Sequence, residues 1–369
     1  MTSSLFQPCT IPGHKLKNRF AMAPMTRARA TADGTPTDIM TTYYEQRSEA
    51  GLIISEGTNI TPQGQGFPNT PGIFRDSHVE GWKKVTDRVH VAGSCFFLQL
   101  WHVGRIGHPD SMGPGLQPLA PSAIAFERDV MTATGLKPAP QPRAMEQEEI
   151  DATVADYAKA AERALEAGCD GVEIHAANGY LPGQFLHQSS NKRTDKYGGS
   201  IENRVRFVTE VAQACADAVG AGKVGIRLTP LSGFNGAFSD DEPALYRHLL
   251  QCLANIGLLY VHVVGAEIAG NRTRDAEECT DIPNVAEFTR PLWPNTLIVG
   301  GDYTRQKAQA ALDETGVDLV AFGRDFIGNP DLVTRLREGH PLTPRTPEAW
   351  YGSGAEGYTD FPRFDGEDR

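Results

Sequence analysis

The feature that most limits the fold of this chain is an alternation, repeated eight times, between short apolar runs and longer segments of helical period. The short runs are rich in β-branched residues and are bounded by glycine and proline, which is typical of buried strands. They are Asn18–Met25, Leu52–Ile60, Cys95–Gly104, Gly171–Asn178, Lys223–Pro230, Leu259–Gly265, Leu297–Gly301 and Leu319–Arg324. This alternation predicts an α/β protein with a parallel sheet.

The segments between the runs carry apolar residues at three- and four-residue intervals, which predicts helices. The clearest are Glu148–Ala167, Asp240–Ala254 and Arg305–Asp313. Eight strand–helix repeats favour a closed (β/α)8 TIM barrel, and a doubly wound sheet is the alternative. No linker, internal repeat or low-complexity tract divides the sequence, so residues 1–369 are expected to form a single domain.

Two segments interrupt the repeat. Ser3–Lys17 predicts an N-terminal hairpin that turns at Pro12-Gly13. Arg105–Met145 follows the third predicted strand and is rich in proline and glycine. A connection of this length in a compact domain is usually functional, so the insertion 105–145 is expected to act as a cap or lid.

Composition excludes several classes of function. The 369 residues carry 46 acidic and 35 basic side chains, a formal net charge of −11, which disfavours nucleic acid and anionic membranes as partners. The six cysteines are scattered without a CxxC pair, so no metal site or disulfide framework is expected. No apolar stretch approaches the ~20 residues that cross a bilayer, and no secretory signal is visible. A cytoplasmic protein is expected.

Three polar side chains follow the fourth predicted strand: His175, Asn178 and Tyr180. Active sites of barrels lie at the carboxyl ends of strands, so these side chains should face the mouth. Histidine and asparagine can each donate a hydrogen bond to one oxygen, as in an oxyanion site, and a tyrosine can give a proton to a neighbouring carbon. A buried core histidine and a packing tyrosine are the alternative, but three donors at one strand end favour a catalytic site.

The segments His175–His187 and Asn191–Arg204 resemble the signature of the Old Yellow Enzyme family of flavoproteins, and the resemblance extends from Leu5 to Pro362. It implies a TIM barrel with tightly bound, non-covalent FMN, which NADPH or NADH reduces as a transient hydride donor. The activity it implies is the reduction of activated C=C bonds in α,β-unsaturated carbonyl compounds. In this family the counterparts of His175 and Asn178 hold the substrate carbonyl oxygen. The counterpart of Tyr180 protonates the α-carbon after hydride from flavin N5 has reached the β-carbon.

The same resemblance places flavin contacts at the ends of the first two predicted strands. Thr26 would contact flavin O4 and tune its reduction potential, whereas the residue alone is equally compatible with a turn cap. A sister branch of the family has cysteine at this place. Gly57 would let the backbone approach the flat ring, or it marks an ordinary tight turn. The residues before Thr26 complete this set of contacts: Ala23, Pro24 and Met25.

Two further flavin contacts lie inside predicted strands. Gln99 offers both a donor and an acceptor to a pyrimidine edge and resembles the flavin-binding glutamine of the family. Arg227 is a charge within a strand, which is costly without a partner. Because reduced flavin is negative at N1, Arg227 could stabilise the reduced state.

The phosphate of the cofactor is expected after the seventh and eighth predicted strands, where barrels often bind phosphate. Glycines free backbone N–H groups there, and an arginine supplies a bidentate donor. The expected ligands are Gly300, Gly301, Asp302, Gly323 and Arg324. Asp302 places an acid where many relatives have a neutral residue, so its carboxylate is expected to turn away from the phosphate.

The resemblance also assigns Trp101, Phe67 and Tyr358 to the substrate cavity. Phe67 stands where relatives usually have tyrosine, which should shift substrate preference without abolishing the chemistry. The acidic segment Phe238–Glu242 is expected to be a solvated helix cap rather than a border of the mouth.

Other functions remain as alternatives. The protein could be a flavin-binding sensor or store without turnover, or a reductase acting mainly on nitrate esters or quinones. A dienoyl-thioester reductase would need an iron–sulfur site and a second nucleotide-binding domain, for which the cysteine spacing and length leave no place. A 2-hydroxy acid oxidase would need a different His/Arg pair. The sequence decides neither between NADH and NADPH nor between a monomer and a homodimer.

Overall fold

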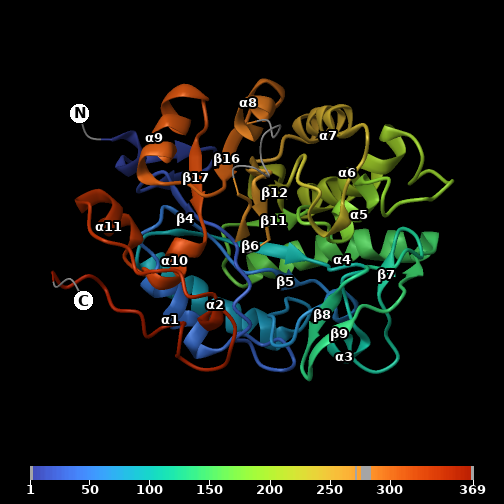
Figure 1. The fold of residues 1–369 in the computed structure, drawn as a ribbon, viewed down its shortest axis with the longest axis horizontal. Helices are drawn as coiled ribbons and strands as arrows, with labels where there is room; N and C mark the ends of the chain where they lie inside the picture. The colour runs from blue at the N-terminus through green and yellow to red at the C-terminus, as the bar shows by residue number, and fades with distance from the viewer. Residues whose placement is uncertain (1–2, 271, 276–283, 367–369) are drawn as a thin grey trace.

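The computed structural model describes residues 3–270, 272–275 and 284–366. Within these ranges eight parallel strands form a closed barrel (Figure 1), in which β17 pairs with β3 and β6 pairs with β11. The strands are β3 (Phe20–Met22), β4 (Leu52–Ile54), β6 (Cys95–Trp101), β11 (Gly171–His175), β12 (Val224–Leu228), β13 (Tyr260–Val264), β16 (Thr296–Gly300) and β17 (Leu319–Phe322). Each lies within, or within one residue of, a predicted run, so the predicted TIM barrel is confirmed.

The helices that connect the strands surround the barrel (Figure 1). The three clearest predicted helices are confirmed as α4 (Gln147–Glu166), α7 (Glu242–Ile256) and α9 (Arg305–Glu314). The others are α1 (Asp38–Gln46), α2 (Asp76–Val91), α5 (Leu181–Leu186), α6 (Ile201–Val219), α8 (Val285–Thr289), α10 (Arg324–Gly328) and α11 (Leu332–Glu338). Among the described residues no helix combines the length and the apolar character needed to cross a membrane.

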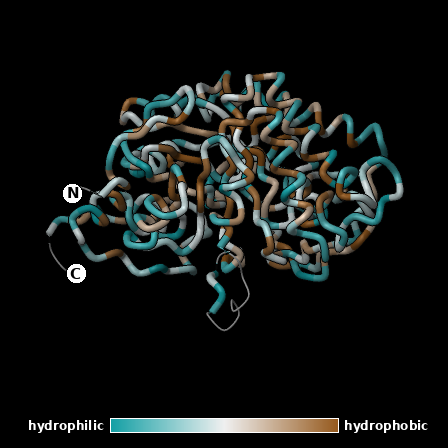
Figure 2. The backbone as a smooth tube through the Cα atoms, turned by 90° about the horizontal axis from the view of Figure 1, so that it is seen from above, coloured by the Kyte–Doolittle hydropathy of each residue, from teal (hydrophilic) through white to brown (hydrophobic). Residues whose placement is uncertain are grey.

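The predicted N-terminal hairpin is confirmed and closes the amino end of the barrel. β1 (Cys9–Ile11) pairs antiparallel with β2 (His14–Leu16), and Gly13 takes a positive φ of 82° in the turn. Ile11 and Leu16 pack into the apolar interior of the barrel, together with residues near the strand starts such as Leu52 and Phe97. Figure 2 shows hydrophobic segments gathered inside the molecule and hydrophilic ones at its periphery. Since the amino end is plugged, ligands have access at the carboxyl ends of the strands.

The predicted insertion after the third barrel strand is also present. It contains α3 (Pro109–Met112), the hairpin of β8 (Asp129–Thr132) and β9 (Gly135–Pro138), and the short parallel pair of β7 (Leu119–Ala120) and β10 (Arg143–Ala144). These elements gather on the side of the molecule away from the two termini (Figure 1). Val130 of β8 packs with Ile106 and Phe126, and Tyr180 packs against this group. The insertion therefore packs beside Tyr180, and its role as a cap or lid stays a prediction.

Candidate active site

The turn after β11 brings the first predicted site residues to the barrel mouth. His175 ends the strand, and Tyr180 directly precedes α5. Asn178 has a φ of 57°, a left-handed conformation that asparagine tolerates. Its backbone N–H donates to Thr229 Oγ1 at 2.9 Å, and its C=O accepts from Asn235 Nδ2 at 2.9 Å. The backbone is thus fixed, and in the described part of the chain the side-chain amide of Asn178 has no hydrogen-bond partner.

Aromatic contacts bring Phe67, Trp101, His175 and Tyr180 into one group. The ring centroids of His175 and Tyr180 are 5.0 Å apart and those of Trp101 and Tyr180 are 5.1 Å apart, both edge to face. Phe67 stacks on Trp101 at 5.5 Å. These contacts define the position of the Tyr180 ring, and the structure therefore joins four residues that the sequence assigned to catalysis or substrate binding.

The surroundings keep His175 and Tyr180 in their neutral forms. Burial, together with the positive charge of Arg227, holds the pKa of His175 well below its usual value. Its Nδ1 accepts a long hydrogen bond of 3.4 Å from the backbone N–H of Ala177, which assigns the ring proton to Nε2. Burial raises the pKa of Tyr180 above its ordinary value. The site therefore presents a neutral imidazole donor and a protonated phenol.

A buried hydrogen-bond network lies one layer deeper in the barrel. The carboxylate of Glu173 accepts from Gln99 Nε2 at 2.7 Å, His262 Nδ1 at 2.9 Å and Tyr260 Oη at 3.2 Å. Gly225 leaves the space that the Tyr260 ring fills, since a Cβ there would lie 2.2 Å from the ring. Buried charges need partners, and this carboxylate is held by three donors.

Arg227 lies one layer nearer the mouth than Glu173, level with His175 and His262 on the neighbouring strands. Its buried Nε has no hydrogen-bond partner among the described residues. Burial lowers the pKa of Arg227, and the charge of Glu173 opposes that effect. The sequence analysis missed Glu173 and His262, although both are polar residues inside predicted strands, the same signal that singled out Arg227.

The segment after β3 runs beside the loop after β17. Ala23 donates its N–H to the C=O of Phe322 at 2.9 Å, and a Cβ on Gly323 would lie 3.6 Å from Met25 Sδ. The buried carboxylate of Glu56 accepts from the backbone N–H groups of Arg27 and Ala28, both at 3.1 Å. These bonds hold the intervening Pro24, Met25 and Thr26 at the mouth. Thr26 is partly exposed there.

The Trp101 ring leaves no space for a side chain at position 57. A Cβ on Gly57 would lie 2.7 Å from the indole ring, closer than real Cβ contacts come. Its φ lies outside the positive range, so a tight turn does not explain the glycine. The structure thus shows a packing role that the sequence analysis did not consider.

Asp302 forms two ion pairs that the sequence analysis did not predict. Its Oδ1 lies 3.3 Å from Arg324 Nη2 and 2.8 Å from Arg345 Nη2, and the expected turn of this carboxylate away from a bound phosphate stays a prediction. The other oxygen accepts from Thr273 Oγ1 at 3.2 Å. The physical reason is that two arginines meet at this point, and the sequence analysis missed Arg345.

Gly300 and Gly301 occupy places where a side chain would not fit. A Cβ on Gly300 would lie 3.0 Å from His262 Nε2, a buried nitrogen without a partner in the described ranges. A Cβ on Gly301 would lie 2.8 Å from Glu267 Oε1. The end of β16 thus lies against the side chains of His262 and Glu267, and the Glu267 carboxylate occupies the space beside Gly301.

Tyr358 does not line the mouth, contrary to the prediction. It is fully buried and stacks on Tyr43 with ring centroids 4.1 Å apart. The guanidinium groups of Arg27 and Arg29 lie 5.0 and 4.7 Å from its ring. The aromatic residue of this segment that reaches the site is Tyr351, which is 53% exposed and close enough to Tyr180 to affect its pKa.

The segment Phe238–Glu242 leads into the start of α7, as predicted for a helix cap, and Phe238 and Asp240 are exposed, but Glu242 is not solvated. Glu242 is buried, and its carboxylate accepts from the backbone N–H groups of Leu231 at 2.8 Å and Ser239 at 3.2 Å. Asp241 pairs with the buried Arg204. The acids satisfy loop backbone groups and a buried cation, which the sequence pattern does not reveal. They hold the loop that carries Asn235, the residue bonded to the backbone of Asn178.

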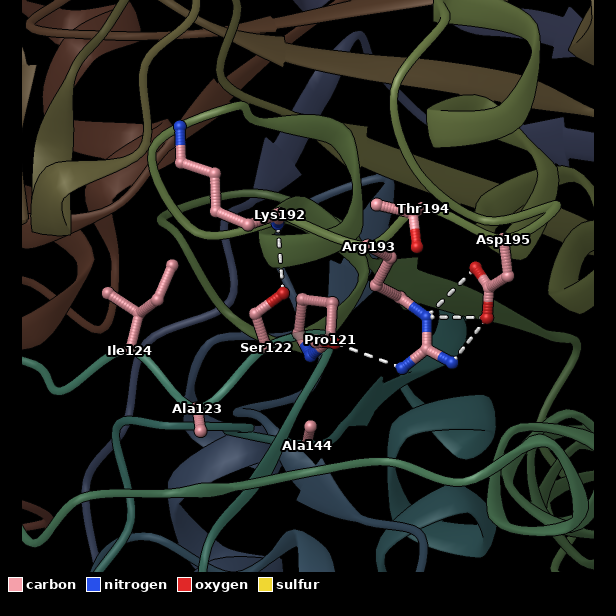
Figure 3. A pocket seen from close by; sticks show the side chains of 9 residues that line it. All are labelled: Pro121, Ser122, Ala123, Ile124, Ala144, Lys192, Arg193, Thr194 and Asp195. Carbon is pink, nitrogen blue, oxygen red and sulfur yellow. Dashed lines mark hydrogen bonds and ion pairs between the residues drawn. The ribbon is translucent and has the colours of Figure 1, made fainter.

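A hollow of about 480 Å³ lies between the insertion and the loop after α5 (Figure 3). Its lining includes Ser122, Lys192 and Arg193 and contains none of the predicted site residues. Arg193 pairs with Asp195 and donates to the carbonyl oxygens of Pro121 and Met145 at 3.0 and 2.6 Å. These contacts attach the middle and the end of the insertion to the loop after α5, so the hollow lies along the boundary between the two segments.

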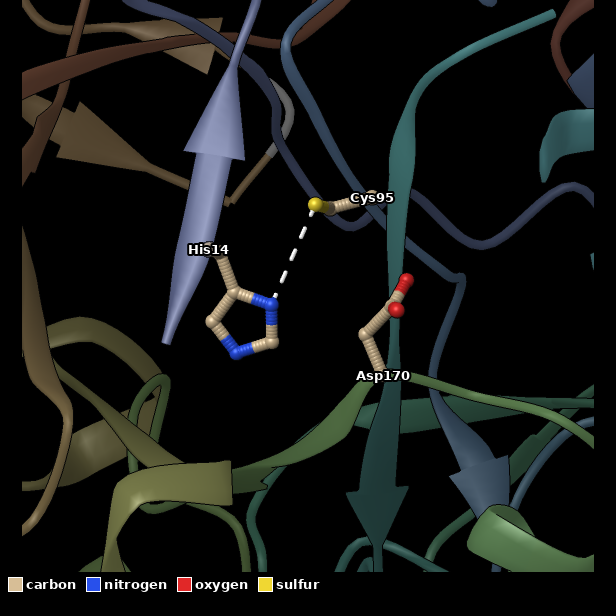
Figure 4. Close-up of side chains that lie close together, drawn as sticks. All are labelled: His14, Cys95 and Asp170. Carbon is tan, nitrogen blue, oxygen red and sulfur yellow. Dashed lines mark hydrogen bonds between the residues drawn. The ribbon is translucent and has the colours of Figure 1, made fainter. Parts of the chain in front are cut away.

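His14, Cys95 and Asp170 meet where the hairpin closes the amino end of the barrel (Figure 4). Their potential metal-binding atoms lie within 4.8 Å of one another, although the residues are far apart in sequence. The Asp170 carboxylate already accepts from the backbone N–H of Phe96 at 2.7 Å and from His90 Nε2 at 2.9 Å. Burial raises the pKa of the Cys95 thiol to about 12. This cluster connects the hairpin to the barrel, away from the mouth.

A (β/α)8 barrel with polar residues from several strand ends at one open mouth defines a barrel enzyme. More specifically, this chain belongs to the NADH:flavin oxidoreductase / NADH oxidase family, whose sequence profile matches residues 4–343. It is thus a flavin oxidoreductase, and the resemblance to Old Yellow Enzyme is confirmed.

Individual relatives are similar over nearly their whole length. A chanoclavine-I aldehyde reductase of Penicillium roqueforti is 41% identical, covering 97% of this chain and 96% of the relative. A probable flavin mononucleotide-dependent alkene reductase of Leishmania infantum is 39% identical, with 97% of both chains covered. The solved structure of an Old Yellow Enzyme homologue from Zymomonas mobilis has a TM-score of 0.92 and 40% identity, covering 98% of this chain and 100% of that chain.

Proposed function

We propose that this protein is an FMN-dependent reductase of activated alkenes, such as α,β-unsaturated ketones and aldehydes, with NADPH or NADH as the reductant. The observation that carries the proposal is the placement of His175, Asn178 and Tyr180 in the turn after β11, one strand away from Arg227, whose buried Nε has no hydrogen-bond partner among the described residues. The names of the Penicillium and Leishmania relatives, an aldehyde reductase and an alkene reductase, support the same substrate class.

The residues present fit FMN. Buried nitrogens of Arg227 and His262 lack partners in the described ranges, and Gly300, which has no side chain, leaves His262 Nε2 uncovered. Gln99, Arg227 and Thr26 would hold the ring system together with the backbone of Ala23–Met25. At the phosphate we expect Gly300, Gly301, Asp302, Gly323 and Arg324. Bound FMN would supply hydride transfer.

His175 and Asn178 would hold the carbonyl oxygen of the substrate. The neutral His175 donates one hydrogen bond from Nε2, and the free amide of Asn178 donates a second. Two donors on one oxygen draw electrons from the conjugated double bond, so the β-carbon becomes the electrophilic position. A donor of this kind commonly contributes ~10²–10³ in rate.

Tyr180 would supply the proton for the α-carbon. Its raised pKa keeps the phenol protonated at neutral pH, and an enolate is basic enough to take that proton. Trp101 and His175 meet the Tyr180 ring edge to face, which keeps the hydroxyl at one angle. Phe67 and Trp101 offer an apolar wall to the substrate without the hydroxyl that a tyrosine would add.

The test separates an enzyme from a flavin-binding sensor or store. The purified protein is reduced anaerobically with NADPH or NADH and then mixed with cyclohexenone, while flavin absorbance is followed. The wild type should bleach and recover, whereas a sensor would bleach without recovery. Nitrate esters and quinones, tested in parallel, show whether another acceptor is preferred.

The Tyr180→Phe variant tests the proton donor. It should still be reduced by nicotinamide and still bind phenols, yet reoxidise slowly with the enone. Tyr157→Phe is a matched control, because Tyr157 is a buried tyrosine on α4 whose hydroxyl has no hydrogen-bond partner in the part of the chain that the structure describes. Enone reduction by Tyr180→Phe at the wild-type rate would show that the proton comes from elsewhere.

A further inference from the structure

The expected phosphate site of this chain contains a group of four charged side chains whose charges cancel. Arg324 and Arg345 are the cations, and Asp302 and Asp325 are the anions. Arg345 donates from Nη2 to Asp302 at 2.8 Å and from Nε to Asp325 at 2.7 Å. The four residues come from the loop after β16, the start of α10 and the segment after α11.

Within this group, Asp302 pairs with Arg324, the cation to which the phosphate is expected to bind. Arg324 Nη2 lies 3.3 Å from Asp302 Oδ1 and donates to Thr273 Oγ1 at 2.7 Å. Thr273 in turn donates to the other oxygen of Asp302 at 3.2 Å. A carboxylate and a phosphate present the same kind of oxygen acceptors to a guanidinium. The Asp302 carboxylate therefore pairs with Arg324 at the position expected for the FMN phosphate.

We propose that Asp302 competes with the FMN phosphate for Arg324, and that Arg345 retains the Asp302 carboxylate when the phosphate takes its place. This inference rests on the proposed FMN site. It makes Asp302 and Arg345 specificity-determining residues, because they affect a flavin that carries a phosphate and leave riboflavin unaffected.

The charges explain why both residues are needed. A phosphate monoester carries roughly −1.5 to −2 at neutral pH, so an unpaired carboxylate beside it would repel it. Arg345 bonds to Asp302 without using Arg324, so it can neutralise the carboxylate while Arg324 turns to the phosphate. Bonds to two carboxylates keep Arg345 charged, and they raise its pKa.

The segment that contains Arg345 also leads from the phosphate end of the expected site toward its substrate end. Arg345 lies six positions before Tyr351, the exposed tyrosine that influences Tyr180. The segment that neutralises Asp302 at the phosphate end thus continues to the substrate end of the mouth. Occupation of the phosphate site would fix this segment at Arg345.

The experiment compares the affinities of the apoprotein for FMN and riboflavin by quenching of flavin fluorescence. Asp302→Asn should bind FMN about tenfold more tightly and Arg345→Ala about tenfold more weakly, the size expected for one partly exposed charge near a bound anion. Riboflavin affinity should change less than about twofold in both. The double variant should bind FMN about as tightly as Asp302→Asn alone, because without the carboxylate the arginine has nothing to neutralise; a return to wild-type affinity would show two independent charges and overturn the coupling.

A matched control is Arg290→Ala, which removes an arginine from a pair with Asp318 at the amino end of β17. It should leave both affinities unchanged. If Arg345→Ala is poorly folded, Arg345→Gln removes the charge while keeping much of the side chain. Equal changes for FMN and riboflavin in the Asp302 and Arg345 variants, or weaker FMN binding by Asp302→Asn, overturn the inference. A wild-type protein that binds neither flavin overturns the proposed function itself.

Discussion

The side-chain amide of Gln99 donates a hydrogen bond of 2.7 Å to the carboxylate of Glu173 inside the barrel. This bond assigns the orientation of the amide, because a carboxylate accepts only from the nitrogen end. Gln99 Oε1 is therefore the acceptor that remains for a ligand at the mouth, which suits the N3–H of a flavin pyrimidine ring. Glu173 acts through Gln99 and Arg227, so we interpret it as a positioning residue.

The Glu173→Gln variant should raise the midpoint potential of bound flavin. Removing the negative charge leaves the cation of Arg227 without compensation, and this cation stabilises the negative charge of reduced flavin. About 1.4 kcal/mol of added stabilisation corresponds to ~30 mV for a two-electron couple. The potential is measured against a reference dye during slow anaerobic reduction.

Glu210→Gln is the control, since Glu210 lies on α6, outside the barrel interior, and accepts a hydrogen bond from Tyr197 Oη. A potential of Glu173→Gln that is unchanged or more negative would contradict the role of Glu173. A purely structural effect would reduce flavin affinity or protein stability without moving the potential in the positive direction.

The comparison of sequence and structure shows which features a sequence can reveal. Buried parallel strands appear as continuous apolar runs, so all eight barrel strands were located before the structure was known. The run Leu52–Ile60 still contained a break, because Ser55–Gly57 leaves the ladder before β5 (Thr58–Asn59) resumes beside β6. Residue type and periodicity indicate burial, but they do not indicate breaks in pairing.

The contacts that the sequence analysis missed concern side chains whose partners are distant in sequence. Asp302 meets Arg345 43 positions away, and Tyr358 stacks on Tyr43 315 positions away. Neither pairing leaves a local pattern. Glu173 could have been found, because a carboxylate inside a predicted strand needs a partner just as Arg227 does. The group at the end of β11 was predictable because its three members lie within six residues.

Removing either proposed oxyanion donor should slow enone reduction. We expect His175→Ala and Asn178→Ala each to lower kcat by ~10²-fold, because the donors act on charge that develops during hydride transfer. Reduction by nicotinamide should suffer less, since it develops no enolate. Stopped-flow measurement of the two half-reactions separates these effects. Equal slowing of both half-reactions would instead indicate a general disturbance of the flavin site.

Gly57→Ala should perturb the mouth through Trp101. The added methyl would lie 2.7 Å from the indole ring, which must shift against Phe67 and Tyr180. Overpacking of this kind typically costs about 1–3 kcal/mol, measured as a loss in the free energy of unfolding. Gly222→Ala is the control, because no heavy atom lies within 4 Å of its added Cβ. We also expect a changed ratio of activities toward small and bulky enones; unchanged stability and substrate preference would refute the packing role.

Stability should fall on acidification partly because of His102. Burial lowers the pKa of its imidazole from 6.5 to about 3, and its Nδ1 accepts from the backbone N–H of Gly104 at 3.1 Å. Below pH 6.5 the unfolded chain binds a proton that the folded protein does not bind until about pH 3. This residue therefore costs about 1.4 kcal/mol of stability per pH unit as the pH falls through that window.

Urea unfolding of wild type and His102→Asn at pH 7 and pH 5 measures the contribution. The His102→Asn variant should lose less stability between the two pH values, since asparagine can accept the same hydrogen bond without titrating. The control is His248→Asn, at a partly exposed position on α7, which should follow the wild type more closely. Identical losses in His102→Asn and wild type would mean that this imidazole is protonated in the folded protein as readily as in the unfolded chain.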